Sequence, residues 1–338
     1  MNIRRLIFAA AILAAVVSCK KDEDTTALPT FDGYLRITGT KEYIGLGETL
    51  TLKPKGLTHP KGKEIGYYWK VSPSMSSYDT TRYTNGLDKN GNPSDGSFVH
   101  TFPDSADSLA TYTIQCYAYA DGYSGSSASS YTTIVKGGQG GSIKGVDFRN
   151  EITIGAQTWS GNNISDQSKG VAYSKADIMS DVFGRYYNYP DAVQVCNSLG
   201  EGWQLPTMSD WDELMAYIEG NIEADKNYSA TVASALMGNA TFNGVTMWTY
   251  RPAVGDINNA SGFSAIPAGF ATFGQNQDGS ADYSNSIFEG KYQYAVFWVE
   301  SGSDPQPSCK YLIWNQGEVQ TYLTDSKLFG ASVRCIRK

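Results

Sequence analysis

The chain has 338 residues and a formal net charge of −7, from 27 lysines and arginines against 34 aspartates and glutamates. Phosphate backbones are repelled by such a surface, so the composition predicts no nucleic-acid partner. Only 18% of the residues are charged, while glycine (35) and tyrosine (23) are abundant. This mixture favours extracytoplasmic β structure with many turns, and the length suggests two domains.

Residues 1–18 have the features of an export signal. Arg4 and Arg5 precede the apolar run Leu6–Val17, which is shorter than the roughly 20 residues that a membrane-spanning helix needs. The segment Val16–Cys19 resembles the bacterial lipobox, in which the cysteine becomes the lipidated first residue of the mature protein. We therefore expect lipidation at Cys19; an ordinary secreted protein with a chance cysteine is the alternative.

The acidic cluster that follows Cys19 indicates where the mature protein goes. Lys20–Asp24 resembles the surface-export signal of Bacteroidetes lipoproteins, which implies an outer-membrane protein that is lipid-anchored and faces the cell exterior. Removing the signal takes away Arg4 and Arg5 but no acid, leaving 25 − 34 = −9. Residues 19–32 are polar and predict a flexible tether, so the lipid is the expected membrane contact.

Residues 33–136 predict a β-sandwich domain. Runs at 48–52, 67–71, 112–119 and 130–135 resemble strands, with turn residues between them. The placement of Trp69, and of Tyr112 ahead of Cys116, resembles immunoglobulin-like and polycystic-kidney-type (PKD) sandwiches. That resemblance implies that Trp69 packs in the core and Tyr112 lies near a corner. Another sandwich topology is the alternative. We expect Cys116 to be a small buried apolar residue.

The glycine-rich segment 137–145 predicts a linker, and 146–338 a second domain. Its motifs follow in order: Ile152–Trp159, Gly184–Asn188, Gly202–Leu214, Ser261–Phe270 and Phe329–Cys335. In this order they resemble the Fibrobacter succinogenes major paralogous domain. The resemblance implies an α+β fold, C-type-lectin-like or formylglycine-generating-enzyme-like, and leaves the activity undefined. The expected fold class is thus an all-β Ig-like sandwich followed by an α+β C-type-lectin-like domain.

Three helices are predicted in the second domain. One follows Thr207, whose hydroxyl suits an N-cap that accepts from the amide of Asp210, with a stripe of apolar residues at Trp211, Leu214, Met215 and Ile218. Another begins near Pro190 and stops at Gly200, and a short one spans 229–237 with Gly238 as its C-terminal cap. Capping and the helix dipole explain the acids after Thr207 without a catalytic role.

The cysteines of the second domain suggest a disulfide. Lectin-like domains tie a helix to the end of the chain, so we expect a bond between Cys196 and Cys335. Cys309 is then left over, either as a buried strand residue or as a reactive thiol. Formylglycine-generating chemistry needs a cysteine pair, so an enzyme of this type is not expected.

Few residues offer catalytic or metal-binding chemistry. The chain's two histidines, His59 and His100, both lie in the first half, which excludes a histidine-dependent triad or zinc site from the second. Segments 306–308 and 314–316 resemble the calcium triplets of lectins, but Ser308 and Gln316 stand where carboxylates are required. Loops 88–92 and 276–280 contain Asn-Gly or Asp-Gly and predict hairpin turns. We expect no metal, no cofactor and no catalytic residue.

The stretch 239–293 is rich in Asn, Asp, Gly and aromatic residues and predicts long loops that form a calcium-free binding surface. Its candidate ligand-binding residues, with two from a neighbouring strand, are Trp248, Tyr250, Arg251, Asp256, Asn258, Asn259, Trp314 and Asn315. Core packing of the tryptophans and simple turns at the Asn/Gly clusters are the competing interpretation for each residue.

The predicted function is non-catalytic recognition, either adhesion or the binding of a glycan or protein at the cell surface. The first alternative is a carboxylate-dependent hydrolase such as a glycosidase, which would pair two acids among Asp256, Asp278, Asp282, Glu289 and Glu300. The second alternative is a structural component of a surface appendage, for which an exposed apolar groove or an unpaired strand edge would be the signature.

Overall fold

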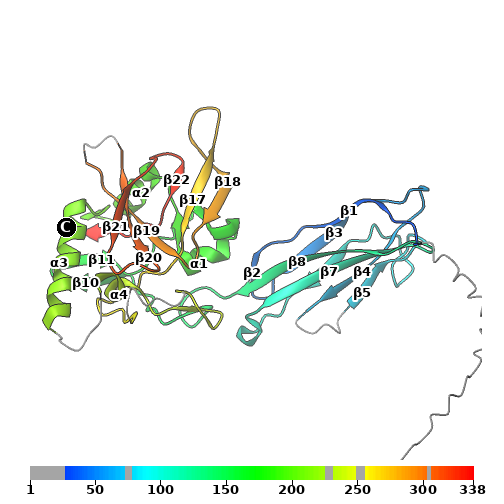
Figure 1. Cartoon of the computed structure of the whole chain (residues 1–338), viewed down its shortest axis with the longest axis horizontal. Coiled ribbons are helices and arrows are strands. Elements are labelled where there is room, and N and C mark those ends of the chain that lie inside the picture. Colours follow the sequence, from blue (N-terminus) through cyan, green and yellow to red (C-terminus); the bar gives the residue numbers. More distant parts are fainter. Residues whose placement is uncertain (1–26, 73–77, 225–230, 249–255, 303–305) are drawn as a thin grey trace, which may run out of the picture.

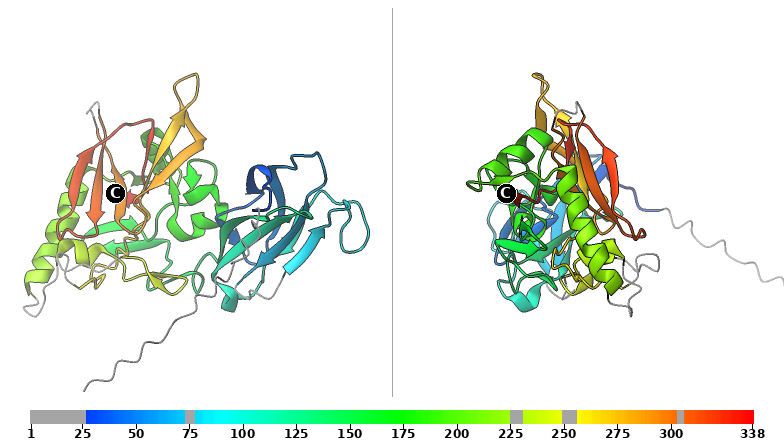
Figure 2. Two further views of the ribbon diagram at one scale, coloured as in Figure 1. Left: turned by 45° about the vertical axis from the view of Figure 1, so that its right-hand side comes forward. Right: turned by 90° about the vertical axis from the view of Figure 1, so that its left-hand side faces the viewer.

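The computed structural model describes residues 27–72, 78–224, 231–248, 256–302 and 306–338. Most of the regular structure is β, arranged in several small sheets. Strands β1 to β8 lie at one end of the molecule and helix α3 lies at the other (Figure 1). The left-hand view in Figure 2 keeps the same separation. None of the helices in the described ranges is long and apolar enough to span a membrane. The lipidation site predicted at Cys19 lies outside the described residues.

Two facing sheets make up the N-terminal region. The three-stranded sheet has the order β1 (Asp32–Thr38), β3 (Thr49–Thr58) and β6 (Phe98–Thr101). The five-stranded sheet has the order β2 (Tyr43–Gly45), β8 (Ser126–Val135), β7 (Thr111–Tyr119), β4 (Gly66–Val71) and β5 (Tyr78–Arg82). The pair β2–β8 is parallel, and the other pairs are antiparallel. A 3₁₀ turn, η1 (Ala106–Ser108), precedes β7. The four strand segments predicted here are confirmed.

Trp69 joins the two sheets of this region. Its side chain is fully buried, its indole donates to the carbonyl of Gly96 at 3.0 Å, and its ring stacks on Phe98 with the centroids 5.7 Å apart. Alternate residues of β7 point into the same core, including Tyr112 and Cys116. The core roles predicted for Trp69 and Cys116 are therefore confirmed.

The glycine-rich segment connects the two regions as a tight loop. The amide of Ser142 donates to the carbonyl of Lys136 at 2.7 Å, and the Ser142 hydroxyl accepts from the amide of Lys136 at 3.0 Å. A Cβ atom on Gly141 would come within 2.2 Å of the carbonyl oxygen of Lys136. Glycine is needed here because the backbone folds back on itself.

Small sheets build the C-terminal region. One has the order β10 (Glu151–Ile154), β11 (Gln157–Ser160), β23 (Ile336–Arg337) and β14 (Trp203–Gln204). Another has the order β19 (Tyr294–Val299), β20 (Ser308–Ile313) and β21 (Gln320–Leu323). A third has the order β18 (Ala281–Glu289), β17 (Phe270–Gln275) and β22 (Phe329–Gly330). A fourth sheet has the order β16 (Val245–Thr246), β15 (Thr241–Phe242) and β9 (Ile143–Lys144), and β12 (Val171–Ala172) pairs with β13 (Arg185–Tyr186).

Helices flank these sheets. The short segments η2 (Tyr173–Lys175), η3 (Asp177–Met179) and α1 (Ser180–Phe183) precede α2 (Tyr189–Asn197), α3 (Met208–Ala224) and α4 (Val232–Leu236). The predicted α2 begins one residue before Pro190, and its N-cap is Asn188. For α4 the cap is Thr231, which forms a reciprocal capping box with Ser234. The structure therefore begins α4 later and ends it one residue earlier than predicted.

A cluster of buried residues connects the two regions. Tyr43 and Val135 from the N-terminal region pack with Phe183, Tyr186 and Phe242 from the C-terminal region. Polar contacts add to this interface, because the Asn243 side-chain amide donates to the carbonyl of Ile134 at 3.0 Å and the Ser174 hydroxyl donates to the Glu42 carboxylate.

Candidate binding site

A groove of about 880 Å³ lies between α3, the start of α4 and the turn from β20 to β21. It belongs to the end of the molecule that is farthest from the N-terminal strands (Figure 1). Its described lining residues are Met215, Glu219, Ile222, Thr231, Val232, Gln316, Gly317, Glu318, Val319 and Gln320.

Helix α3 provides one wall because its sequence presents two adjacent faces. As predicted, the amide of Asp210 donates to the Thr207 hydroxyl at 3.3 Å, and Thr207 donates back to the Asp210 carboxylate, so the helix starts at a reciprocal cap. The first face carries Trp211, Leu214 and Ile218, which are buried in the core. The second face carries Met215, Glu219 and Ile222 at helical spacing and borders the groove.

The opposite wall is the turn at 314–320. The amide of Gln316 donates to the carbonyl of Ile313 at 3.0 Å, which closes the turn after β20. The amide of Ala233 donates to the carbonyl of Gly317 at 3.1 Å, which attaches the turn to α4. The groove is therefore preformed between elements that hydrogen bond to one another.

The lining combines an apolar floor with acidic groups. Ile222, Val232 and Val319 are partly buried and pack on the same core as Trp211. Glu219 and Glu318 are exposed carboxylates. No lysine, arginine, histidine or cysteine is among the described lining residues. This chemistry suits binding of apolar and positively charged groups, and it offers no nucleophile paired with a base.

The prediction that Trp248 forms a stacking face is wrong. Its side chain is only 2% exposed, its indole donates to the carbonyl of Ala265 at 3.3 Å, and its ring belongs to the core that contains Trp159. An indole with a satisfied N–H is a common core residue. Tyr250 and Arg251 lie outside the described residues.

Asn258 and Asn259 lie beside α4, because their backbone amides donate to the carbonyl of Ser234 at 3.4 and 3.3 Å. Asp256 is exposed, and Asn258 accepts the amide of Ala260 in a local turn. Asn259 is committed to Ser264, because its amide donates to the Ser264 hydroxyl at 2.8 Å and its oxygen accepts the Ser264 amide at 2.8 Å. The competing interpretation, turns at the Asn/Gly clusters, therefore describes Asn258 and Asn259.

Trp314 and Asn315 are the predicted residues next to the groove. Trp314 is partly buried against the core, and exposed Asn315 directly precedes the lining residue Gln316. The sequence prediction missed Ile222, Val232 and Val319. Their apolar side chains carried no signal that separated a groove wall from ordinary core.

The structure contains one bonded pair of cysteines in the C-terminal region and leaves Cys309 free. Cys196 and Cys335 are bonded, with their Cα atoms 5.5 Å apart, which confirms the predicted disulfide. Cys309 is free and fully buried, and burial raises the pKa of its thiol well above the usual value. The interpretation of Cys309 as a reactive thiol is therefore wrong, because the thiolate is the reactive form.

The carboxylates named for a hydrolase do not line the groove. Asp278 and Asp282 are on the β17–β18 hairpin, and hydrogen bonds from Ser280 and Ser284 lower the pKa of each carboxyl. Glu300 accepts from the Tyr189 hydroxyl at 2.9 Å. Lowered pKa values are the reverse of what a general acid needs.

Loop and metal predictions can be compared with the described residues. The loops at 88–92 and 276–280 are turns, closed by amide-to-carbonyl bonds from Asp88 to Asn92 and from Asn276 to Ser280. Ser308, in the first lectin-like triplet, is buried in β20. Within the described ranges, no group of three or more His, Cys, Asp or Glu residues is arranged to hold a metal ion.

Fold and groove together define a β-rich, disulfide-linked protein with a preformed surface site. Residues 152–337 match the family model described as the Fibrobacter succinogenes major domain. The chain belongs to this family, as its motifs predicted. No curated protein matches it in sequence. Among the solved structures that match is "Drosophila OTK, extracellular domains 3-5", at 10% identity, covering 91% of this chain and 67% of that chain, with a TM-score of 0.22.

Proposed function

We propose that this protein is an exported, lipid-anchored surface protein whose C-terminal region recognises another protein through the α3 groove, without catalysis. The proposal includes two domains, an Ig-like sandwich at 33–136 and a lectin-like domain at 146–338, joined by 137–145. Separate sheets, and one core confined to each region beside the cluster that they share, support the division. The pairing of β23 with both β11 and β14 supports the lectin-like assignment, since it joins the two ends of the domain.

The groove lining is the observation that carries the proposal. Its apolar floor offers area for aliphatic or aromatic side chains, and Glu219 and Glu318 favour lysine or arginine beside them. A sugar site would be expected to offer an aromatic ring for stacking, and the described lining has none. Of the two expected ligand classes, this chemistry favours a protein segment with apolar and basic residues.

The position of the groove supports a surface role. The N-terminal strands and α3 lie at opposite ends of the molecule (Figure 1). A lipid at Cys19 would therefore hold the sandwich near the membrane and leave the groove at the far end, where a partner has access. The deeply buried Cys309 and the carboxylates of Asp278 and Asp282, which accept from neighbouring serines, support a non-catalytic role.

Charge reversal of the rim tests the recognition proposal. Peptides selected from a random display library on the full-length protein should be rich in apolar and basic residues. The double variant Glu219→Lys/Glu318→Lys should weaken their binding by tenfold or more, measured by fluorescence anisotropy. Glu213→Lys, on the same helix but outside the lining, is the matched control and should bind normally.

Three outcomes would count against peptide recognition by the groove. Selective binding on a glycan array with no peptide selected would indicate a sugar ligand. Equal effects of the control and the double variant would move the site elsewhere. Self-association at micromolar concentration without peptide binding would favour the assembly role.

Metabolic labelling tests the anchor separately. A fatty-acid probe should be incorporated into the wild-type protein, and Cys19→Ser should abolish incorporation and release the protein from the membrane fraction. A wild-type protein that is secreted without label would contradict the anchor and would leave the groove proposal untouched.

A further inference from the structure

Arg334, close to the C-terminus, is a buried cation. Its side chain is 1% exposed, and its guanidinium lies 4.6 Å from the centre of the Phe263 ring. Nε donates to the side-chain oxygen of Asn163 at 2.9 Å, Nη1 to the carbonyl of Ser160 at 3.0 Å and Nη2 to the carbonyl of Ser264 at 3.3 Å. These bonds use three of the five N–H groups of a guanidinium, and each acceptor is formally neutral.

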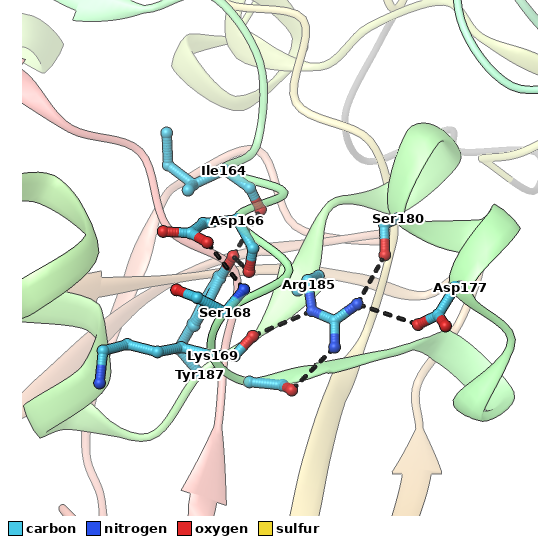
Figure 3. A network of polar contacts seen from close by, with 9 residues as sticks. Ile164, Asp166, Ser168, Lys169, Asp177, Ser180, Arg185 and Tyr187 are labelled. Carbon is cyan, nitrogen blue, oxygen red and sulfur yellow. Dashed lines mark hydrogen bonds and ion pairs between the residues drawn. The ribbon is translucent and has the colours of Figure 1, made fainter. Parts of the chain in front are cut away.

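A second buried arginine, Arg185, has the carboxylate partner that Arg334 lacks among the described residues. Arg185 donates to the Asp177 carboxylate at 3.2 Å and to the Ser180 hydroxyl at 3.1 Å, and it also binds the carbonyls of Lys169 and Gly170 (Figure 3). Its charge is therefore paired. Among the ion pairs of the described residues, none includes Arg334. Burial lowers the pKa of Arg334 to about 9, so the side chain remains charged at neutral pH.

A small cavity adjoins the unpaired charge. It has a volume of about 150 Å³ and is lined by Val146, Phe148, Asn162, Asn163, Ser165, Ser180, Asp181, Val182, Gly184, Ser264, Ile266 and Arg334. Ser165 and Asp181 are its exposed residues, so they mark the mouth. Ser180 is only 2% exposed, and its oxygen already accepts from Arg185. Among the described residues, the Ser180 hydroxyl donates no hydrogen bond, so its hydrogen can serve a guest in the cavity.

We propose that this cavity binds a small monovalent anion, a halide or a short carboxylate, through Arg334 and Ser180. Burying an unpaired charge is costly, and an anion that accepts the spare N–H and O–H groups removes that cost. The Arg185 network fixes Ser180 and the loop at 164–170, so this wall of the cavity is preformed (Figure 3). The volume admits formate, acetate or chloride and excludes anions as large as citrate.

The Asp181 carboxylate at the mouth repels an anion electrostatically, so removing its charge tests the proposal. Asp181→Asn removes the only carboxylate in the described lining and should tighten anion binding several-fold. Asp107→Asn makes the same charge change in the N-terminal region and should leave affinity unaltered. Ser180→Ala should weaken binding. Arg334→Gln should abolish it, and Asp181→Asn keeps the proposal testable if Arg334→Gln does not fold.

The measurement is thermal unfolding of the full chain at constant ionic strength, with citrate as the excluded anion. Chloride, bromide, formate and acetate are compared, and the effective ones should raise Tm by about 2 °C for each tenfold increase in concentration above the dissociation constant. If only the halides or only the carboxylates raise Tm, the effective class is identified as the ligand of the cavity. Crystals grown with bromide should show an anomalous peak beside Arg334.

The proposal would be overturned by a cavity that holds only water both at saturating bromide and at saturating acetate. It would also be overturned if citrate stabilised the protein as well as chloride did, or if Asp181→Asn and Asp107→Asn had equal effects. These experiments do not involve the α3 groove, so their failure would leave the proposed recognition role in place.

Discussion

The four cysteines within the described residues all lie in the core, and they differ in whether a second sulfur is within reach. Cys196 on α2 meets Cys335 just before β23, whereas Cys116 and Cys309 are surrounded by apolar side chains. Burial raises the pKa of Cys116 to about 12 and that of Cys309 still more clearly. These two thiols are therefore packing residues, and the bonded pair carries the covalent stabilisation.

Removing the disulfide should lower the free energy of unfolding substantially. The bond closes a loop of 139 residues, for which the chain-entropy model gives roughly 5 kcal/mol as an upper estimate. We expect the double variant Cys196→Ser/Cys335→Ser to lose a large part of this in denaturant unfolding. Reductant should bring the wild-type protein toward the same stability and leave the variant unchanged. A loss below about 1 kcal/mol would mean that the unfolded chain gains little freedom.

Single-residue predictions succeeded where a residue's surroundings are determined by its neighbours in the sequence. The cap at Thr207 depends on Asp210 three residues later, and Trp69 follows a strand pattern. The prediction for Trp248 failed because its environment comes from distant segments: the carbonyl of Ala265 accepts its N–H, and its ring joins a core built from across the C-terminal region. Loop composition does not reveal that a tryptophan inside it points inward.

At the scale of elements, the sequence located the long helices and strands well. A cap residue and an apolar stripe predict helix α3, and strict alternation of polar and apolar residues predicts β7. The two-residue strands β14 and β23 have no such periodicity, and they exist because Arg337 and Ile336 find partners in distant segments. Local sequence patterns therefore could not predict the small sheets of the C-terminal region.

The groove was unpredictable for the same reason. It forms only when α3, α4 and the turn at 314–320 meet, and the bond from Ala233 to Gly317 that holds two of them together links segments far apart in sequence. Met215 was predicted as part of the apolar stripe, yet it lines the groove because it lies at the edge of the buried face of α3. Helical spacing defines a stripe but not what covers its margins.

At the scale of the whole molecule, the two regions are held together by a lysine among tyrosines. The Lys291 ammonium donates to the Tyr43 hydroxyl at 2.6 Å. It lies 5.2, 4.8 and 5.1 Å from the ring centres of Tyr43, Tyr173 and Tyr292. Tyr43 belongs to the N-terminal region and the other residues to the C-terminal one, so this cation–π cluster spans the interface. Together with the closed loop at 137–142, it favours a fixed arrangement of the two regions.

Lys291→Met should loosen this arrangement. The change keeps much of the side-chain volume and removes the cation–π contacts and the bond to Tyr43, worth about 1–2 kcal/mol together for a partly exposed lysine. In scanning calorimetry, we expect the wild-type regions to unfold in one transition and the variant to show the N-terminal region unfolding first. Lys175→Met is the matched control, since exposed Lys175 donates to Ser284 within the C-terminal region. If Lys291→Met retained one transition at the wild-type Tm, the coupling would have to reside in the buried contacts of Val135 and Phe242 instead.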